Sequence, residues 1–595
     1  MAVKIMNALR NGDGTAFDRL LRESPEAVNA KGSRGWTPIM YAALYGDGET
    51  VRVLLNKGAN PNAQNDDGGT ALMYATDNEE KTKLLLDQGA TPNLRSGEGR
   101  TALLVAVGGA GSYPVVKLLL DKGADAGIGL PDGRGGLSAA AGSRDAKVLQ
   151  LLLDHGVNTK AVPLGPVLAG GCTACFDMLL PFAESADLTG GLQGAVRAGD
   201  LPRIKTLLDR GARPGANLLQ IVAVSPAPIP LDAIRSLISR GADVNAKSST
   251  GLTMVDFAKR QGNATLVDAL AQAGASGGSV PPPQPGRKLA LSPRAAMERI
   301  LPALQRADVA FLQRAGCVSC HNNSLTAMTI AAARAKGVRV NDQIAKDQSR
   351  RIAAFLQENG ERALENEGLP GGVDTVSYIL LGLAAYGYPS DPITDVWARY
   401  VKNNQSSDGR WVCNALRPPL ESSDFQVTAA SIRSLKTYRP KSQESDYDKA
   451  VERSIHWLET SQPASTEDLA FKILGLIWGG GSQSAIRESA QALLALQGSN
   501  GGWSQTKTLP SDAYATGQAL VSLKEAHAIP IGSPAYRRGV QYLLNSQLED
   551  GSWHVQTRAP AIQPYFDSDF PHGPDQFISA AASNWASMAL APVVR

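Results

Sequence analysis

The sequence predicts an all-α protein in which two different arrays of helix pairs are joined by a linker. Residues 1–275 repeat one motif, and residues 292–595 repeat another. Residues 276–291 are rich in glycine, serine and proline, a composition typical of linkers. A chain of 595 residues with 43% hydrophobic residues is long enough for two such domains.

The first array repeats a segment that reads Leu-Leu, a short polar stretch, and then glycine with a small residue. Copies lie at 54–60, 85–90, 119–125 and 152–158, and later ones centre on Gly211 and Gly241. Successive glycines are 31, 34, 33, 55 and 30 residues apart, and openings such as Thr37-Pro38-Ile39 precede the repeats. This part resembles the ankyrin-repeat family, whose period is near 33 residues.

The resemblance implies about eight stacked helix pairs, because one pair is too small to bury its own apolar face. We expect each glycine to end the second helix of its pair in a left-handed conformation. We also expect the concave face of this solenoid to bind a protein partner.

The second array contains three strings with glutamine at the start and Gly-x-Trp at the end. They run from Gln405 to Trp411, from Gln497 to Trp503 and from Gln547 to Trp553. They resemble the QW motifs of squalene-hopene cyclases and of prenyltransferase-type proteins. The resemblance implies a terpenoid cyclase-like α/α toroid, in which the glutamine caps a helix end and the tryptophan stacks on the neighbouring repeat.

Five aspartates interleave with these strings, and each opens an apolar stretch that is rich in small residues. They are Asp374, Asp424, Asp468, Asp512 and Asp575, at spacings of 50, 44, 44 and 63 residues. Aspartate at a helix start accepts hydrogen bonds from free backbone N–H groups. We therefore expect five buried inner helices capped by these residues, with the QW-bearing helices outside them.

The pentapeptide 317–321 has the C-x-x-C-H spacing of covalent haem c attachment. Thiols at Cys317 and Cys320 can bond the two vinyl groups of one porphyrin, and His321 can ligate the iron as the metal-binding residue. The alternatives are a reducible disulfide, two buried thiols beside a helix-end histidine, or another metal site.

The sixth iron ligand stays open, and a five-coordinate iron is one option. Met328 lies on roughly the same helix face as His321, so it would struggle to reach the other side of the iron. We expect His554 and His572 to be surface or packing residues.

Other functions find less support in the residues. The net charge is only +3 and no basic run occurs, which argues against nucleic-acid binding. No stretch approaches 18 apolar residues, so no membrane span is expected. A cyclase needs Asp-x-Asp-Asp, of which Asp512 supplies one carboxylate, and Cys413 lacks the preceding aspartate of a prenyltransferase zinc site. We expect Cys172 and Cys175, a second C-x-x-C, to be small buried residues.

The sequence thus predicts a bacterial-type protein in which ankyrin repeats bind a protein and a toroid carries haem c for electron transfer or another haem-based role. The alternatives are a haem-free terpenoid cyclase-like enzyme and a pure interaction scaffold, so enzyme activity stays open. Attached haem would imply a periplasmic or extracytoplasmic location and a start upstream of Met1, since no signal peptide is present. Without haem we expect a cytoplasmic protein.

Overall fold

The computed structural model describes residues 1–130, 135–215, 218–225, 229–248, 251–277, 292–415, 417–559 and 565–594. The side chains of residues 142–143 and 320–321 are outside this description. The predicted linker 276–291 lies outside the described residues from 278 onward.

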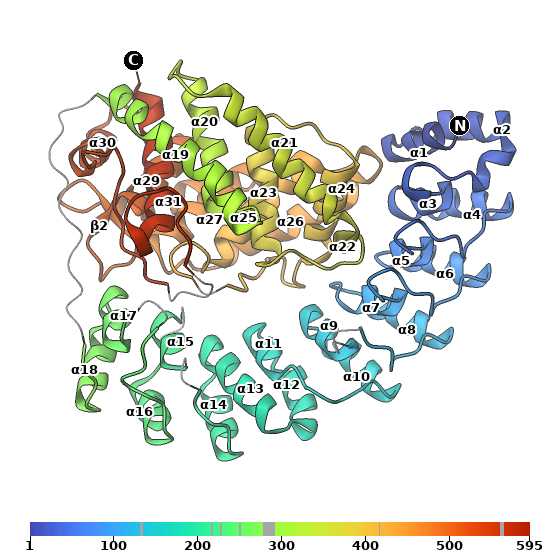
Figure 1. The fold of residues 1–595 in the computed structure, drawn as a ribbon, viewed down its shortest axis with the longest axis horizontal. Coiled ribbons are helices and arrows are strands. Elements are labelled where there is room, and N and C mark those ends of the chain that lie inside the picture. The colour runs from blue at the N-terminus through green and yellow to red at the C-terminus, as the bar shows by residue number, and fades with distance from the viewer. Residues whose placement is uncertain are drawn as a thin grey trace.

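The N-terminal half of the described chain consists of nine helix pairs that follow one another in a curved array (Figure 1). The pairs are α1 (Ala2–Asn11) with α2 (Gly14–Glu23), α3 (Pro38–Tyr45) with α4 (Gly48–Asn56), α5 (Ala71–Tyr74) with α6 (Glu79–Asp87), α7 (Ala102–Val107) with α8 (Tyr113–Asp121), α9 (Gly136–Ser143) with α10 (Ala146–Asp154), α11 (Leu164–Ala169) with α12 (Thr173–Leu179), α13 (Ser185–Ala198) with α14 (Leu201–Asp209), α15 (Leu218–Val224) with α16 (Leu231–Ser239), and α17 (Met254–Arg260) with α18 (Ala264–Gln272). Short 3₁₀ turns are η1 (Pro25–Asn29), η2 (Ser33–Gly35) and η3 (Leu180–Phe182).

The repeated glycines end the second helices as predicted. Their φ angles lie between 76° and 97° at positions 58, 89, 123, 156, 211 and 241. No atom would obstruct a Cβ at these positions, so the glycine is needed for its backbone conformation rather than for space. At the other end, second helices begin with a side-chain cap, as where Asp47 accepts from the Thr50 N–H at 2.8 Å.

Among the described residues of the C-terminal half, six buried helices contact one another in a closed ring. They are α20 (Leu325–Arg334), α23 (Val373–Ala385), α25 (Asp424–Tyr438), α27 (Thr466–Gly479), α29 (Ala513–Glu525) and α31 (Gln576–Leu590). Each packs against the next, and α31 packs against α20. One cavity is lined by residues from the C-terminal halves of all six, so the helices run in the same direction. We call the end where they begin the N rim and the end where they finish the C rim.

Six further helices surround this ring. They are α19 (Pro293–Ala315), α21 (Asp342–Glu358), α24 (Pro392–Asn403), α26 (Glu444–Thr460), α28 (Gln483–Ala495) and α30 (Pro534–Ser546). Most of them pack against two neighbouring inner helices, as α28 does against α27 and α29. The remaining elements are α22 (Gly360–Leu364), the π turn η4 (Cys320–Ser324), the 3₁₀ turns η5 (Lys441–Gln443), η6 (Gly573–Asp575) and η7 (Ala591–Val593), and the antiparallel pair β1 (Trp503–Ser504) and β2 (Ser511–Asp512).

The three QW-type strings make the same hydrogen bonds. Each glutamine amide donates to the carbonyl of the glycine four residues later and to a carbonyl in another outer helix, at 2.7–3.0 Å in all copies. Each tryptophan is fully buried and donates to a carbonyl ten residues earlier. The glutamine therefore ties two outer helices together, which is more than the expected helix cap. The bond from Gln547 to Ala296 joins the last outer helix to the first.

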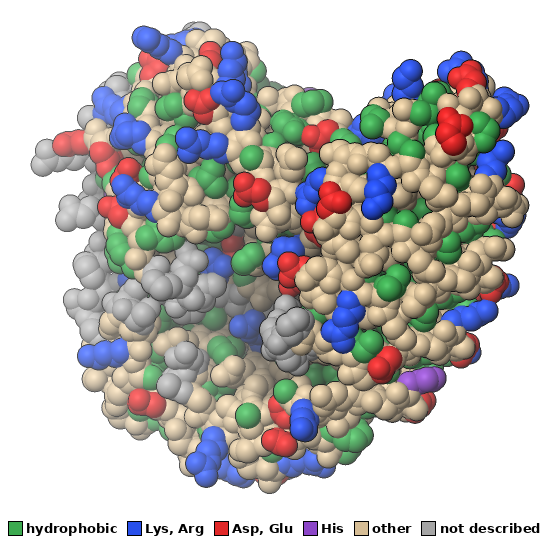
Figure 2. Space-filling view, turned by 45° about the vertical axis from the view of Figure 1, so that its right-hand side comes forward, with side chains coloured by type: hydrophobic (Ala, Val, Ile, Leu, Met, Phe, Trp, Pro, Cys, Tyr) green, Lys and Arg blue, Asp and Glu red, His purple; other side chains and the backbone are tan. Residues whose placement is uncertain are grey.

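The array curves around the C-terminal half, and the first helices of its pairs face that half (Figure 1). Figure 2 shows the surface hollowed between the two. Cys172 and Cys175 form a disulfide at the start of α12, and Cys172 is only half-buried, which corrects the expectation of two small buried residues. None of the described helices combines the length and apolarity needed to cross a membrane.

Candidate functional site

The C-x-x-C-H motif lies at the N rim, in the connection from α19 to α20. Helix α19 ends at Gly316, which has a left-handed φ of 64°, and the π turn η4 then leads into the inner helix. Cys317 is a free thiol that is half-buried. Burial raises the pKa of this thiol, and the nearby Arg417 guanidinium opposes that shift. The side chains of Cys320 and His321 lie outside the described residues.

Three buried polar residues, Asn322, Asn323 and Ser324, follow the motif, and the Asn323 side chain anchors its loop. The Asn323 amide donates to the backbone carbonyl of Asp308 at 2.9 Å and to the carboxylate of the same residue, and it accepts from the Ser319 N–H at 2.8 Å. Burial raises the pKa of Asp308 to about 7. Asn322 is 2% exposed, and both polar atoms of its side chain lack a hydrogen-bond partner among the described residues. The motif loop is thus tied to α19 and carries an unsatisfied amide.

A cluster of carboxyl groups lies at the same rim, and we call Asp374, Glu421 and Glu467 the N-rim carboxyls. Burial raises the pKa of Asp374 well above its usual range, and Glu421 adds to the shift. Burial raises the pKa of Glu467 to about 8, although Tyr514 donates to this carboxyl at 2.7 Å. Burial thus favours the neutral form of both Asp374 and Glu467.

Two other side chains complete this rim. The Sγ atom of Cys413 lies 4.0 Å from the Asp374 carboxylate, and burial raises the pKa of this thiol well above its usual value. Arg417 forms an ion pair with Glu421 at 3.0 Å. The described residues contain no group of three histidine, cysteine or acidic side chains arranged to hold a metal ion.

The expectation that all five aspartates cap inner helices is only partly right. Asp512 caps α29 by accepting from the Ala515 N–H at 2.9 Å, and Asp468 belongs to a capping box at the start of α27. Asp374, Asp424 and Asp575 do not cap, because Gly372 and Ser423 occupy the cap positions of α23 and α25 and the Asp575 side chain bonds elsewhere.

Two candidate sixth ligands of the iron are bonded to other side chains, and the third lines the cavity of the ring. His554 bonds Asp575 at 2.9 Å, and its ring stacks on His572 at 4.5 Å between centroids. His572 in turn lies 2.7 Å from the Ser552 hydroxyl. Met328 lines the cavity at the C rim, whereas the motif lies at the N rim. The two histidines thus pack against each other and bond neighbouring side chains.

The first part of the array is joined to the C-terminal half by ion pairs. Two nitrogens of the Arg10 guanidinium donate hydrogen bonds to the buried carboxylate of Asp395, at 2.6 and 3.2 Å. Asp77 pairs with Arg399 at 3.0 Å and with Lys402 at 3.6 Å. Burial opposes the charge on Asp77, yet these cations hold its pKa well below the usual range.

Further contacts continue along the array. Tyr74 donates to Glu361 at 2.7 Å, and Arg100 pairs with Glu367 at 2.9 Å. Near the last pair, Arg260 donates to the Thr557 carbonyl and Gln261 to the Arg558 carbonyl, both at 2.8 Å. The chain's own C-terminal half therefore contacts the side of the array on which the sequence placed a protein partner.

Comparison with known proteins identifies the array. Residues 5–96 and 77–162 match the model of the family described as ankyrin repeats (3 copies). Residues 5–162 of this chain therefore contain ankyrin repeats. A stretch of 72 residues is 40% identical to the transient receptor potential cation channel subfamily A member 1 homolog of Caenorhabditis elegans, and it covers 12% of this chain and 6% of that protein.

Shorter matches include the ankyrin repeat, SAM and basic leucine zipper domain-containing protein 1 of Saimiri boliviensis boliviensis, 43% identical over 63 residues, and that of Homo sapiens, 41% identical over 63 residues. These matches cover 11% of this chain and 13% of each relative. The ankyrin repeats support a protein-interaction function.

Sequence reasoning missed the N-rim carboxyls as a group. Glu467 had a usable signal, since it stands beside Asp468 in the first turn of an inner helix and a second acidic residue there is redundant for capping. No pattern in the sequence pointed to Glu421 or Cys413. They lie in a connection whose position depends on how the helices of the ring pack.

Proposed function

We propose that this protein is an ankyrin-repeat interaction protein whose C-terminal half is a terpenoid cyclase-like α/α toroid that carries covalent haem c. The closed ring of six helices within an outer set, together with the repeated glutamine and tryptophan bonds, supports the toroid. One observation carries the haem proposal. The thiol of Cys317 is free and half-buried in a loop at the N rim.

The described residues at the motif fit this group. Cys317 is accessible and is not consumed by a disulfide, and the adjacent Asn322 amide is buried with no partner among the described residues. Cys317 and Cys320 would hold the porphyrin through thioether bonds, and His321 would ligate the iron. Haem supplies one-electron transfer. The bonds of Asn323 to α19 would keep the attachment loop in place.

Haem attachment places the protein in the periplasm or another extracytoplasmic compartment. The test is expression in the periplasm together with a haem-maturation system, followed by denaturing electrophoresis and a stain for covalent haem. We expect a haem-positive band and a c-type visible spectrum. The double variant Cys317→Ala, Cys320→Ala should lose the stain.

The matched control is Cys413→Ala, which removes a second free thiol described at the same rim and should keep the haem. Haem that never appears, or that washes out of the denatured wild-type protein, refutes the proposal. A stain retained by the double variant refutes it as well.

For the array we propose that a protein partner binds the concave face in competition with the chain's own C-terminal half. The contacts from Arg10 near the first pair to Gln261 near the last support this competition. A pure scaffold without haem would share this behaviour, and the visible spectrum distinguishes the two.

A haem-free enzyme is the second candidate, and the protonated Glu467 favours it. A buried neutral carboxylic acid is the form that donates a proton at neutral pH. Incubation of the purified protein with squalene tests this candidate. We expect no cyclic product, because the sequence lacks the Asp-x-Asp-Asp acid; a product that disappears in Glu467→Gln would establish the enzyme instead.

A further inference from the structure

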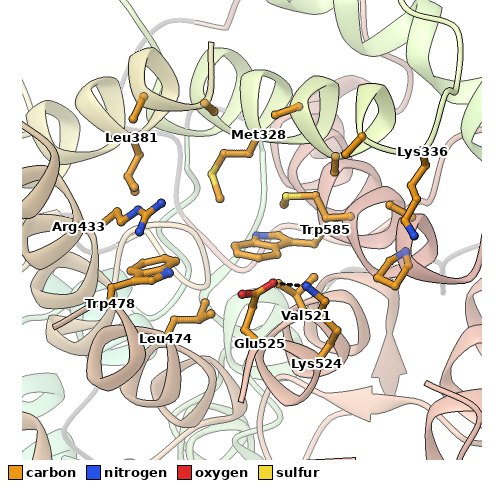
Figure 3. Close-up of a pocket in the computed structure, with 18 of the residues that line it drawn as sticks. Met328, Lys336, Leu381, Arg433, Leu474, Trp478, Val521, Lys524, Glu525 and Trp585 are labelled. Carbon is orange, nitrogen blue, oxygen red and sulfur yellow. Dashed lines mark hydrogen bonds and ion pairs between the residues drawn. The ribbon is translucent and has the colours of Figure 1, made fainter. Parts of the chain in front are cut away.

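A cavity opens at the C rim, at the opposite end of the inner helices from the haem motif (Figure 3). Its volume is about 530 Å³, within the range of roughly 300–1,000 Å³ typical of small-molecule sites. Alanines at 331, 332, 384 and 385 form much of its wall, and their small side chains leave the space open. No part of the proposed function uses this cavity.

The interior of the cavity is apolar. Trp585 is almost fully buried and presents its indole to the centre, and Met328 points toward it from the neighbouring helix α20 (Figure 3). Leu381 and Leu474 line the same space. Burial of a hydrocarbon chain against such a lining is favourable, because it removes apolar surface from water. The lining offers few hydrogen bonds to a polar ligand.

The mouth of the cavity is positively charged. Arg433 lies 5.9 Å from the centre of the Trp478 ring, and Lys336 lines the cavity from α20's end. Among the described residues neither cation has a carboxylate within ion-pair distance, whereas Lys524 is paired with Glu525 at 2.6 Å. Three cations and one carboxylate leave the mouth with a net charge of +2.

We propose that this cavity binds an anionic amphiphile with one hydrocarbon chain and a carboxylate head, such as a long-chain fatty acid. The chain would lie against Trp585 and the alanines. The head would remain at the mouth, where Arg433 can bond a carboxylate with two nitrogens and stay stacked on Trp478.

Charge complementarity selects this occupant over a neutral lipid. A neutral hydrocarbon would leave two cations without a counter-charge at an apolar opening, and a cationic amphiphile would be repelled. The exposed Ile531 side chain, 38% accessible, stands at the same opening, where a bound chain would cover it.

The test uses the full chain and a dansyl-labelled undecanoic acid as the fluorescent probe, displaced by palmitate or by hexadecanol. We expect saturable probe binding and displacement by palmitate at lower concentration than by hexadecanol. Trp478 and Trp585 line the cavity, so palmitate should also change the intrinsic fluorescence. Failure of palmitate to displace the probe overturns the proposal, and preferential displacement by an isoprenoid diphosphate overturns the carboxylate head.

Two variants separate the head from the chain. Arg433→Glu reverses an exposed charge and should weaken palmitate binding about tenfold or more, with a smaller effect on hexadecanol. Ala384→Phe should fill the cavity and abolish both. Arg487→Glu, an exposed arginine on the outer helix α28, is the matched control and should bind like wild type.

Unchanged palmitate affinity in Arg433→Glu overturns the proposed head-group site. Because Arg433 is an exposed side chain, we expect this variant to fold like the wild type. The double variant at Cys317 and Cys320 should still bind palmitate. Haem attachment and lipid binding can therefore fail separately.

Discussion

Replacing Glu467 with glutamine should remove a pH dependence from the stability of the C-terminal half. Glu467 is 5% exposed, and burial raises its pKa from 4.5 to about 8. A carboxyl whose pKa is higher in the folded state stabilises the fold fully below pH 4.5. That contribution is lost as the pH rises toward 8, because the unfolded chain ionises freely while the folded chain must bury a charge.

The size of the effect follows from the shift. Each pH unit inside the window costs the wild type about 1.4 kcal/mol relative to Glu467→Gln. Across the window the difference is on the order of 3–5 kcal/mol. The glutamine amide keeps the shape of the side chain and an oxygen that accepts from Tyr514, so the variant should be the more stable protein at pH 8.

The assay is urea unfolding from pH 5 to pH 8.5, followed by tryptophan fluorescence. Seven of the eight tryptophans lie after residue 292, so the signal reports the C-terminal half. The control is Glu452→Gln on α26, an exposed glutamate whose loss should leave the pH profile unchanged. A free-energy difference between wild type and Glu467→Gln that stays flat over this range would show that burial does not perturb Glu467.

Four further results are expected. Asp512→Ala should cost about 0.5–2 kcal/mol of unfolding free energy and Asp512→Asn much less, because asparagine also caps α29; equal losses would contradict the cap. Gln547→Ala should cost about 1–3 kcal/mol, since two carbonyls lose their donor, and an unchanged denaturation midpoint would contradict the role of this residue in closing the ring. Limited proteolysis should cut first in the proline-rich stretch 281–285, and even cleavage along the chain would contradict two stable units. The nicked halves should co-elute in gel filtration and separate in Asp77→Ala, which leaves Arg399 and Lys402 without their shared carboxylate; co-elution of the variant would show that this ion pair does not hold the halves together.

Features set by neighbouring residues could be predicted from the sequence alone. The spacing of the glycines predicted the helix pairs, and the left-handed conformation at positions such as Gly58 is confirmed. The cap formed by Asp512 was also predictable, because a helix start needs an acceptor within one turn. The match of residues 5–162 to ankyrin repeats follows from the same local pattern.

Other features depend on which distant segments meet. Asp374 and Asp424, like Asp512, precede apolar stretches in the sequence. In the packed structure, however, Gly372 and Ser423 occupy the N-cap positions of α23 and α25. The N-rim carboxyls come from three separate segments, and the raised pKa values of Asp374 and Glu467 arise from burial that no local pattern reports.

The sequence by itself determined the helical repeats and the residues of the C-x-x-C-H motif, because both depend on spacings within a few turns. Only the tertiary structure decided that Gln547 bonds Ala296, that Asp77 meets Arg399, and that six helix ends enclose one cavity. The physical reason is that these contacts join residues hundreds of positions apart. Their loop-closure cost is offset only when the whole set of helices packs together.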